Sequence, residues 1–118
     1  MTLSTRLTQR FGIAHPILSA PMAFAAGGRL ASAVTAAGGL GLIGGGYGDR
    51  AWLAAQLALV KPASFGCGFI TWSLARSPEL LDLVLEHRPR AIFLSFGDPA
   101  SLADRIKSAG AALICQGQ

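Results

Sequence analysis

Five short runs of apolar residues recur along the chain, and amphipathic stretches separate them. The runs cover residues 16–22, 40–43, 65–72, 91–96 and 111–116. They are largely apolar at consecutive positions, which is typical of parallel strands that are buried on both faces. The pattern therefore predicts five strands of one parallel sheet.

Four helices are predicted between these strands, because apolar residues there recur at helical spacing. Asp49 and Ser77 precede two of the helices and are good N-cap residues. Glycine or proline follows every helix, as expected where helices end. The expected helices cover residues 29–37, 50–61, 78–88 and 100–109.

The alternation of strand and helix is an α/β pattern, and two architectures fit it. One is a doubly wound open sheet, and the other is the first part of a TIM-type (β/α)8 barrel. The chain has 118 residues, an ordinary length for one domain, so we assign residues 1–118 to a single domain. A complete barrel takes about 250 residues. As a barrel, this chain is truncated to about the first five strands and four helices. We then expect an open sheet edge through which the chain associates with itself, since bare edges pair or aggregate.

The composition indicates that much of the surface of this chain is buried or is covered by another part of the protein. Apolar residues make up 52% and charged residues 14% of the sequence, against about 25% charged in an ordinary soluble domain. The formal net charge is +4, from ten basic and six acidic residues. The basic residues are scattered and form no stripe, so we expect no nucleic-acid partner.

The sequence indicates a soluble protein of the cytoplasm. Its first residues, MTLSTRLTQRFG, lack the apolar core of a signal peptide, and no unbroken apolar run reaches the about 18 residues of a membrane span. Cys67 and Cys115 lie in apolar runs and are expected to be reduced core thiols. No Cys/His spacing predicts a metal site.

Gly39, Gly41 and Gly44 match the dinucleotide-binding pattern G-x-G-x-x-G literally. In that fingerprint the glycines follow a strand and open a helix. Here Gly39 follows a predicted helix and Gly41 lies inside a predicted strand. The better interpretation is a helix cap followed by close packing.

Candidate binding groups stand where the predicted strands end, which is the active-site face of a barrel. Ala20, Pro21 and Met22 end the first strand, and their backbone groups can grip a planar heterocycle. Gly68 leaves room for a ligand beside the third strand, or serves a bulge. Polar residues stand at or near the ends of the other strands: Thr71, Ser95 and Gln116.

No general acid or base is evident. His15 precedes the first strand, on the stability face of a barrel, and His87 lies near a helix end. Neither is placed for proton transfer, and no Ser/His/Asp set or carboxylate pair appears. We therefore predict no catalytic residue and no metal ligand in this chain.

Five motifs resemble the N-terminal half of nitronate monooxygenases, in order and spacing. They are HPILSAPM, AAGGLGLIGGG, GCGFITW, SFGDP and AGAALICQ. The first two are shared with other barrels, including IMP dehydrogenase. The resemblance implies a TIM barrel that holds FMN without a covalent bond and oxidises alkyl nitronates with O₂. It also implies that six residues contact the cofactor: Ala20, Pro21, Met22, Gly68, Phe69 and Gln116.

The sequence departs from the family where catalysis is concerned. The family's catalytic histidine segment, similar to EAGGH, and its phosphate-binding loops are absent from these residues. The resemblance therefore implies an incomplete and largely inactive enzyme. Two alternatives remain open. One is a half-barrel that assembles with itself or with a separate C-terminal half, and the other is a nucleotide-binding fragment similar to IMP dehydrogenase.

Overall fold

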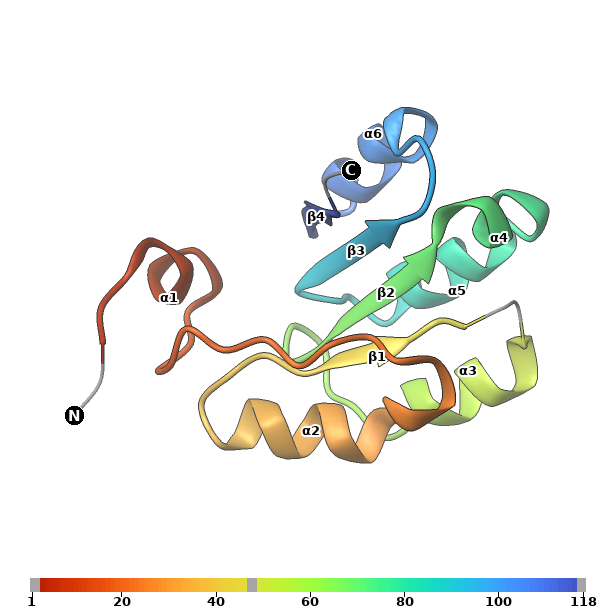
Figure 1. Ribbon diagram of the computed structural model, residues 1–118. Helices are drawn as coiled ribbons and strands as arrows, with labels where there is room; N and C mark the ends of the chain where they lie inside the picture. Colours follow the sequence, from red (N-terminus) through yellow and green to blue (C-terminus); the bar gives the residue numbers. More distant parts are fainter. Residues whose placement is uncertain (1–2, 47–48, 117–118) are drawn as a thin grey trace.

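The fold is built on one parallel sheet. The computed structural model describes residues 3–46 and 49–116. Its strands are β1 (Leu42–Gly44), β2 (Gly66–Ile70), β3 (Ala91–Ser95) and β4 (Ala112–Cys115), all parallel. They lie in the order β1-β2-β3-β4 (Figure 1). A doubly wound sheet reverses its strand order at a switch point, so this uniform order supports the barrel architecture.

Helices alternate with the strands, as the pattern predicts. They cover one face of the sheet, where Ile43, Cys67 and Ile92 pack against helix residues such as Leu53 and Leu81. Figure 1 shows these helices following the sheet from α2, beneath β1, to α6, near β4. The helical elements are α1 (Arg6–Phe11), η1 (Ala23–Ala25), α2 (Gly28–Ala36), α3 (Arg50–Leu57), α4 (Thr71–Arg76), α5 (Glu79–Glu86) and α6 (Ala100–Ser108).

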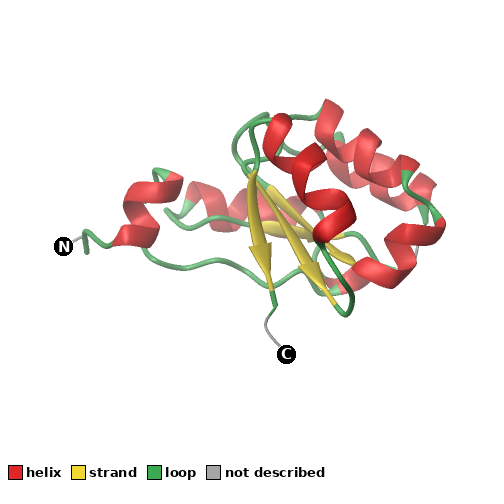
Figure 2. Ribbon diagram, turned by 90° about the horizontal axis from the view of Figure 1, so that it is seen from above, coloured by secondary structure: helices red, strands yellow, loops and turns green. Residues whose placement is uncertain are grey.

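The other face of the sheet carries a smaller core at the amino ends of the strands. Phe11 of α1 belongs to a buried cluster with Leu42, Ala91 and Ala112, which occupy one row of the strand register together with Gly66. In Figure 2, α1 stands apart from the helices on the far side of the strands. The small helix thus closes one end of the inner face, and the opposite end is where the candidate site lies.

The predicted first strand is the main difference between expectation and structure. Within residues 16–22, only Leu18 forms a bridge, to Leu40. Ser19 N–H donates to the Leu40 carbonyl, and Leu40 N–H donates to the Ile17 carbonyl, both at 3.0 Å. Proline has no N–H to donate, so Pro16 and Pro21 leave only a short interior that can pair. The prediction of a full strand here is wrong, although its parallel direction is confirmed.

Helix boundaries also correct the prediction at two places. The third strand ends at Ile70, and Thr71 begins α4, a short helix that periodicity did not reveal. Ser77 is the C-cap of α4 and makes no N-cap hydrogen bond for α5, whose N-cap is Pro78. Asp49 does cap α3, accepting a hydrogen bond from Trp52 N–H at 2.9 Å. The proline after Ser77 displaces the expected cap by one residue.

A further unpredicted helix is α1, which a capping box begins. The Thr5 hydroxyl accepts from Thr8 N–H at 3.1 Å, and Thr5 N–H donates to the Thr8 hydroxyl at 2.8 Å. Threonine replaces the Glu or Gln that usually completes this motif, so the signal was missed. Gly12, with φ of 64°, ends the helix in the left-handed conformation.

No helix among the described residues is long and apolar enough to cross a bilayer.

Candidate functional site

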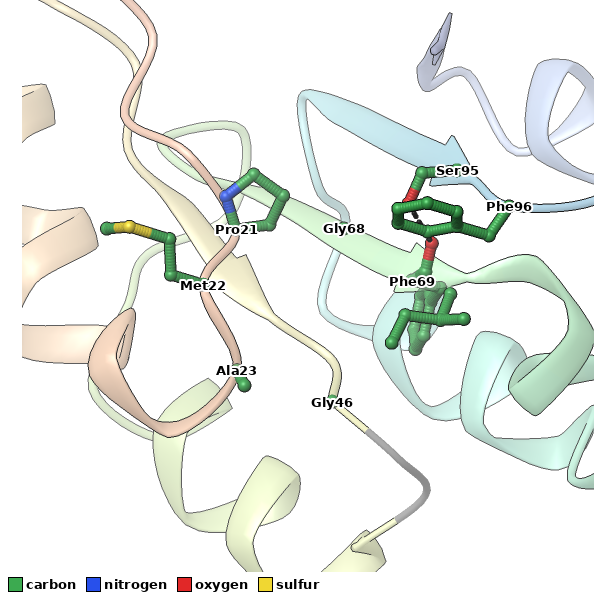
Figure 3. Close-up of a pocket in the computed structure, with 9 residues that line it drawn as sticks. Pro21, Met22, Ala23, Gly46, Gly68, Phe69, Ser95 and Phe96 are labelled. Atoms are coloured by element: carbon green, nitrogen blue, oxygen red, sulfur yellow. Dashed lines mark hydrogen bonds between the residues drawn. The ribbon is translucent and has the colours of Figure 1, made fainter. Parts of the chain in front are cut away.

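A hollow of about 220 Å³ lies at the carboxyl ends of β2 and β3. Elements far apart in the sequence form it, and its apolar walls come from Pro21 and Phe96 (Figure 3). Parallel α/β folds place their ligands at this edge of the sheet. The lining residues are Pro21, Met22, Ala23, Gly46, Gly68, Phe69, Ile70, Ser95 and Phe96.

Pro21 and Gly68 form the floor of the hollow together. A Cβ atom added at Gly68 would overlap the Cβ and Cγ atoms of the Pro21 ring. The absence of a side chain at 68 therefore lets residues 20–22, which we call the ledge, approach the inner face of the sheet. The prediction that Gly68 leaves an empty space for a ligand needs correction, because Pro21 already occupies that space.

One backbone N–H of the ledge, at the lining residue Met22, is without a partner among the described residues. The Met22 carbonyl, in contrast, accepts from Ala25 N–H at 2.9 Å. The Met22 side chain is 50% exposed. Ala23, the next residue, has a φ of 41°, in the left-handed region that residues with a Cβ rarely adopt. The turn into η1 therefore holds an unpaired N–H beside an apolar surface.

The wall of the hollow opposite the ledge is formed by residues at the end of β3. The Ser95 hydroxyl donates a long hydrogen bond of 3.4 Å to the Phe69 carbonyl, which joins the ends of β2 and β3. Phe96, beside the hollow, is 54% exposed, and its φ is 58°. This strained aromatic residue was predicted as the end of a strand, and its place at the site was missed. The Gly-Asp-Pro turn that follows it was the available signal.

Four of the six predicted cofactor contacts line the hollow, namely Pro21, Met22, Gly68 and Phe69. Phe69 contributes its backbone there, because its side chain is 3% exposed and packs in the core beneath the helices. Ala20 belongs to the ledge but is not among the lining residues. Gln116 is exposed beyond β4, where its N–H donates to the Leu94 carbonyl at 3.0 Å, and it does not reach the hollow. The structure thus brings four residues together and leaves these two outside.

Of the other two polar residues predicted at strand ends, only one contributes to the hollow. Ser95 lines the hollow, and Thr71 does not. Thr71 is buried, and its hydroxyl has no partner among the described residues. A Cβ atom added at Gly97 would lie 2.8 Å from the Thr71 Cβ. Thr71 therefore packs against the turn after β3 instead of facing the hollow.

The glycine pattern at residues 39–44 serves packing, as predicted. A Cβ atom at Gly41 would overlap the backbone of Ala31 in α2, and one at Gly44 would overlap Ala23. A Cβ at Gly39 would lie 2.7 Å from the Ile17 carbonyl oxygen. These contacts bring α2 and the ledge close to β1. The dinucleotide interpretation therefore has no support in the fold.

None of the described residues that line the hollow is titratable, so these residues can bind and orient a ligand but offer no group for proton transfer. His87 Nδ1 lies 3.0 Å from the Leu83 carbonyl oxygen, away from the site. Cys67 is buried on the helix side, and burial raises the pKa of its thiol. Cys115 is exposed, contrary to the prediction of a core thiol. Among the described residues, no three His, Cys, Asp or Glu side chains gather as metal ligands.

Comparisons with known proteins agree with this geometry. The chain is 33% identical over 117 residues to the (3aS,4S,5R,7aS)-5-hydroxy-7a-methyl-1-oxo-octahydro-1H-indene-4-carboxyl-CoA dehydrogenase of Mycobacterium tuberculosis. It is 28% identical over 116 residues to the protein of the same name from Rhodococcus jostii. These matches cover 97% and 96% of the chain, but the chain spans only about a third of either relative.

The structure of FabK from Thermotoga maritima superposes with a TM-score of 0.82 at 32% identity. The match covers 97% of this chain and 37% of that one. The described fold is therefore part of a larger barrel architecture. The model of the family named nitronate monooxygenase matches residues 4–66. Since this match extends over more than half of the sequence, the chain belongs to the nitronate monooxygenase family of flavin-dependent oxidoreductases.

Proposed function

We propose that the hollow binds the ring system of FMN and that the protein is an FMN-dependent oxidoreductase. The observation that carries the proposal is the unpaired Met22 N–H beside the apolar surfaces of Pro21 and Phe96. A flavin ring is flat, largely apolar and rimmed by hydrogen-bond acceptors, so these groups suit it. When bound, flavin supplies one- or two-electron redox chemistry.

The described residues fit the ring but not the phosphate of FMN. No lysine or arginine lines the hollow, and phosphate sites use such side chains or the N-terminus of a helix. The α3 N-terminus is already capped by Asp49, whose carboxylate repels an anion. The described residues therefore orient the ring, and binding of the phosphate requires residues other than these.

For the reaction, we propose oxidation of an alkyl nitronate with O₂. Membership of the nitronate monooxygenase family supports this choice. In such a site the described lining residues exclude water and hold the flavin, and none of these residues carries a group that moves a proton. Oxygen consumption with propyl-2-nitronate and FMN measures this activity, and the absence of titratable lining groups leads us to expect a low rate for these residues alone.

A second candidate reaction is dehydrogenation of a CoA thioester. It is favoured by the two relatives whose names describe a carboxyl-CoA dehydrogenase and which match nearly the whole chain. Incubation with an acyl-CoA and an artificial electron acceptor, beside the oxygen-consumption assay with the nitronate, separates the two candidates.

A third candidate is assembly through the open edges of the sheet. Among the described residues, β4 pairs with β3 alone, and Phe93 and Ile114 of the inner face are only partly buried. A second copy would pair its ledge segment with β4 in parallel. Light scattering after gel filtration tests this role, and a monomer at micromolar concentration would exclude it.

Titration with two flavins tests the cofactor proposal. Riboflavin and FMN share the ring and differ in the phosphate. If only the ring is held by these residues, both flavins bind with dissociation constants that agree within about twofold, as less than 0.5 kcal/mol separates them. Quenching of flavin fluorescence gives the constants. Failure of both flavins to bind at millimolar concentration would refute the proposal, and strong preference for FMN would refute the ring-only site.

A further inference from the structure

Phe96 adopts a backbone conformation that its side chain disfavours. Its φ is 58°, and only four described residues other than glycine have a positive φ: Ala23, Ala63, Arg88 and Phe96. Two of these, Ala23 and Phe96, line the same hollow. A Cβ atom makes this conformation costly, and glycine adopts it freely. Such strain is found preferentially at functional sites.

Packing fixes the backbone on both sides of Phe96. Ser95 belongs to β3 and bonds the Phe69 carbonyl. Gly97 lies so close to Thr71 that a Cβ atom there would approach the Thr71 Cβ to 2.8 Å. The turn between these contacts leaves residue 96 in the left-handed region, where the ring points to the hollow.

Burial of the Phe96 ring offsets little of the free-energy cost of the positive φ at this residue. More than half of the Phe96 side chain is exposed, and an exposed aromatic side chain gains little from the hydrophobic effect. Glycine or asparagine would suit the backbone better at this position. The folded chain alone thus gives no reason for phenylalanine, whereas a ligand in the hollow would.

The hollow has the shape of a slot with apolar walls. The Pro21 ring forms one wall, Phe96 forms the other, and Gly68 lies between them, whereas the Met22 side chain points away from Gly68 (Figure 3). Its volume of about 220 Å³ is below the about 300 Å³ of a small-ligand site. The space therefore suits one ring system of a ligand instead of a whole ligand.

We propose that Phe96 binds a flat apolar ring and holds it against the ledge. The inference rests on the proposed function, since the ring is either that of the flavin or that of a cyclic substrate. An offset contact between Phe96 and a ring strengthens binding about fivefold. Phe96 is thus a positioning residue that the comparisons do not identify.

Substitutions at residues 96 and 88 test the inference with a matched control. Arg88 has a φ of 57°, similar to that of Phe96, but lies after α5, away from the hollow. Phe96→Gly and Arg88→Gly relieve strain, and Phe96→Ala and Arg88→Ala retain it. At each position we expect the Gly variant to unfold about 5 °C above the Ala variant.

Ligand binding should distinguish substitutions at Phe96 from those at Arg88. Saturation-transfer NMR with the whole chain measures affinity for riboflavin, for the cyclic nitronate of phenylnitromethane, whose ring is flat, and for the nitronate of 2-nitropropane, which has no ring. Both Phe96 variants are expected to lose about fivefold affinity for at least one ring, and neither Arg88 variant loses any. Loss for riboflavin alone identifies the flavin as the ring, and loss for the cyclic nitronate alone identifies the substrate.

Three results would overturn the inference: Phe96 variants that bind both rings as tightly as the wild type, a wild type that binds neither ring, or a Phe96→Gly variant no more stable than Phe96→Ala. If the wild type binds the cyclic nitronate but no flavin, the FMN proposal fails and the inference is decided by the nitronate alone. If it binds flavin and the Phe96 variants bind equally well, the FMN proposal stands and the inference fails.

Discussion

Replacing Gly68 by alanine is the sharpest test of how the ledge is held. The added methyl group would overlap two atoms of the Pro21 ring, which cannot rotate out of the way as a flexible side chain would. Overpacking of this kind costs about 1–3 kcal/mol, and the rigid ring favours the upper half of that range. At about 4 °C per kcal/mol, which lies between the values for domains of 60–100 and of 150–250 residues, we expect Gly68→Ala to lower the melting temperature by about 10 °C.

Gly66→Ala is the matched control, because Gly66 lies on the same strand and the same face. There the new Cβ would lie 3.0 Å from Leu42 Cγ and 3.1 Å from the Ala91 carbonyl oxygen. The Leu42 side chain can give way, so we expect a loss of less than about 1 kcal/mol. Calorimetry and urea unfolding give the two free energies.

A double substitution shows whether Pro21 is the cause. Pro21→Gly removes both overlapping atoms, so the pair Pro21→Gly and Gly68→Ala should cost at least about 1 kcal/mol less than the sum of the single changes. Hydrogen exchange should report the displaced ledge as faster exchange at Ser19 and Leu40, whose amides bond across the bridge. Additive costs, or equal losses for Gly66→Ala and Gly68→Ala, would refute the reasoning.

Three further substitutions address the cap, the buried hydroxyl and the buried thiol. Asp49→Ala removes the acceptor for Trp52 N–H and should cost about 1 kcal/mol in thermal unfolding; an unchanged melting temperature would contradict the cap. Thr71→Val removes a buried hydroxyl without a described partner, so urea unfolding should show unchanged or up to about 1 kcal/mol higher stability. Burial raises the pKa of Cys67, so the folded state keeps a proton that the unfolded state loses. Stability should therefore fall as pH rises above about 9, and Cys67→Ala should abolish this slope.

The sequence was sufficient to predict the order of the elements, because that order depends on local pattern. Residues 40–43 lie between glycines and residues 91–96 lie between Pro89 and Gly97, and strands formed within both apolar runs. Asp49 was recognisable as a cap from its position alone. The choice between barrel and doubly wound sheet needed the strand order, which periodicity does not contain.

Tertiary contacts account for what the sequence did not reveal. Gly68 was placed at the site, but its contact with Pro21 depends on two segments that meet only in the fold. Phe96 was predicted as the end of a strand, because nothing in an apolar run signals that the neighbouring Gly97 packs on Thr71. Gln116 was carried over from family resemblance, and its position beyond β4 leaves that contact a prediction.

The uniform strand order has a consequence for how the chain is made. Every pairing in the sheet joins a strand to the next one in the sequence, so no strand waits for a partner that is synthesised much later. Each pairing can therefore form as soon as the next strand and its connecting helix are made, and domains fold from the amino end during synthesis. The ledge meets β1 and β2 early, before β3 brings Phe96 to the hollow. On the ribosome, one wall of the ligand slot is therefore complete before the other exists.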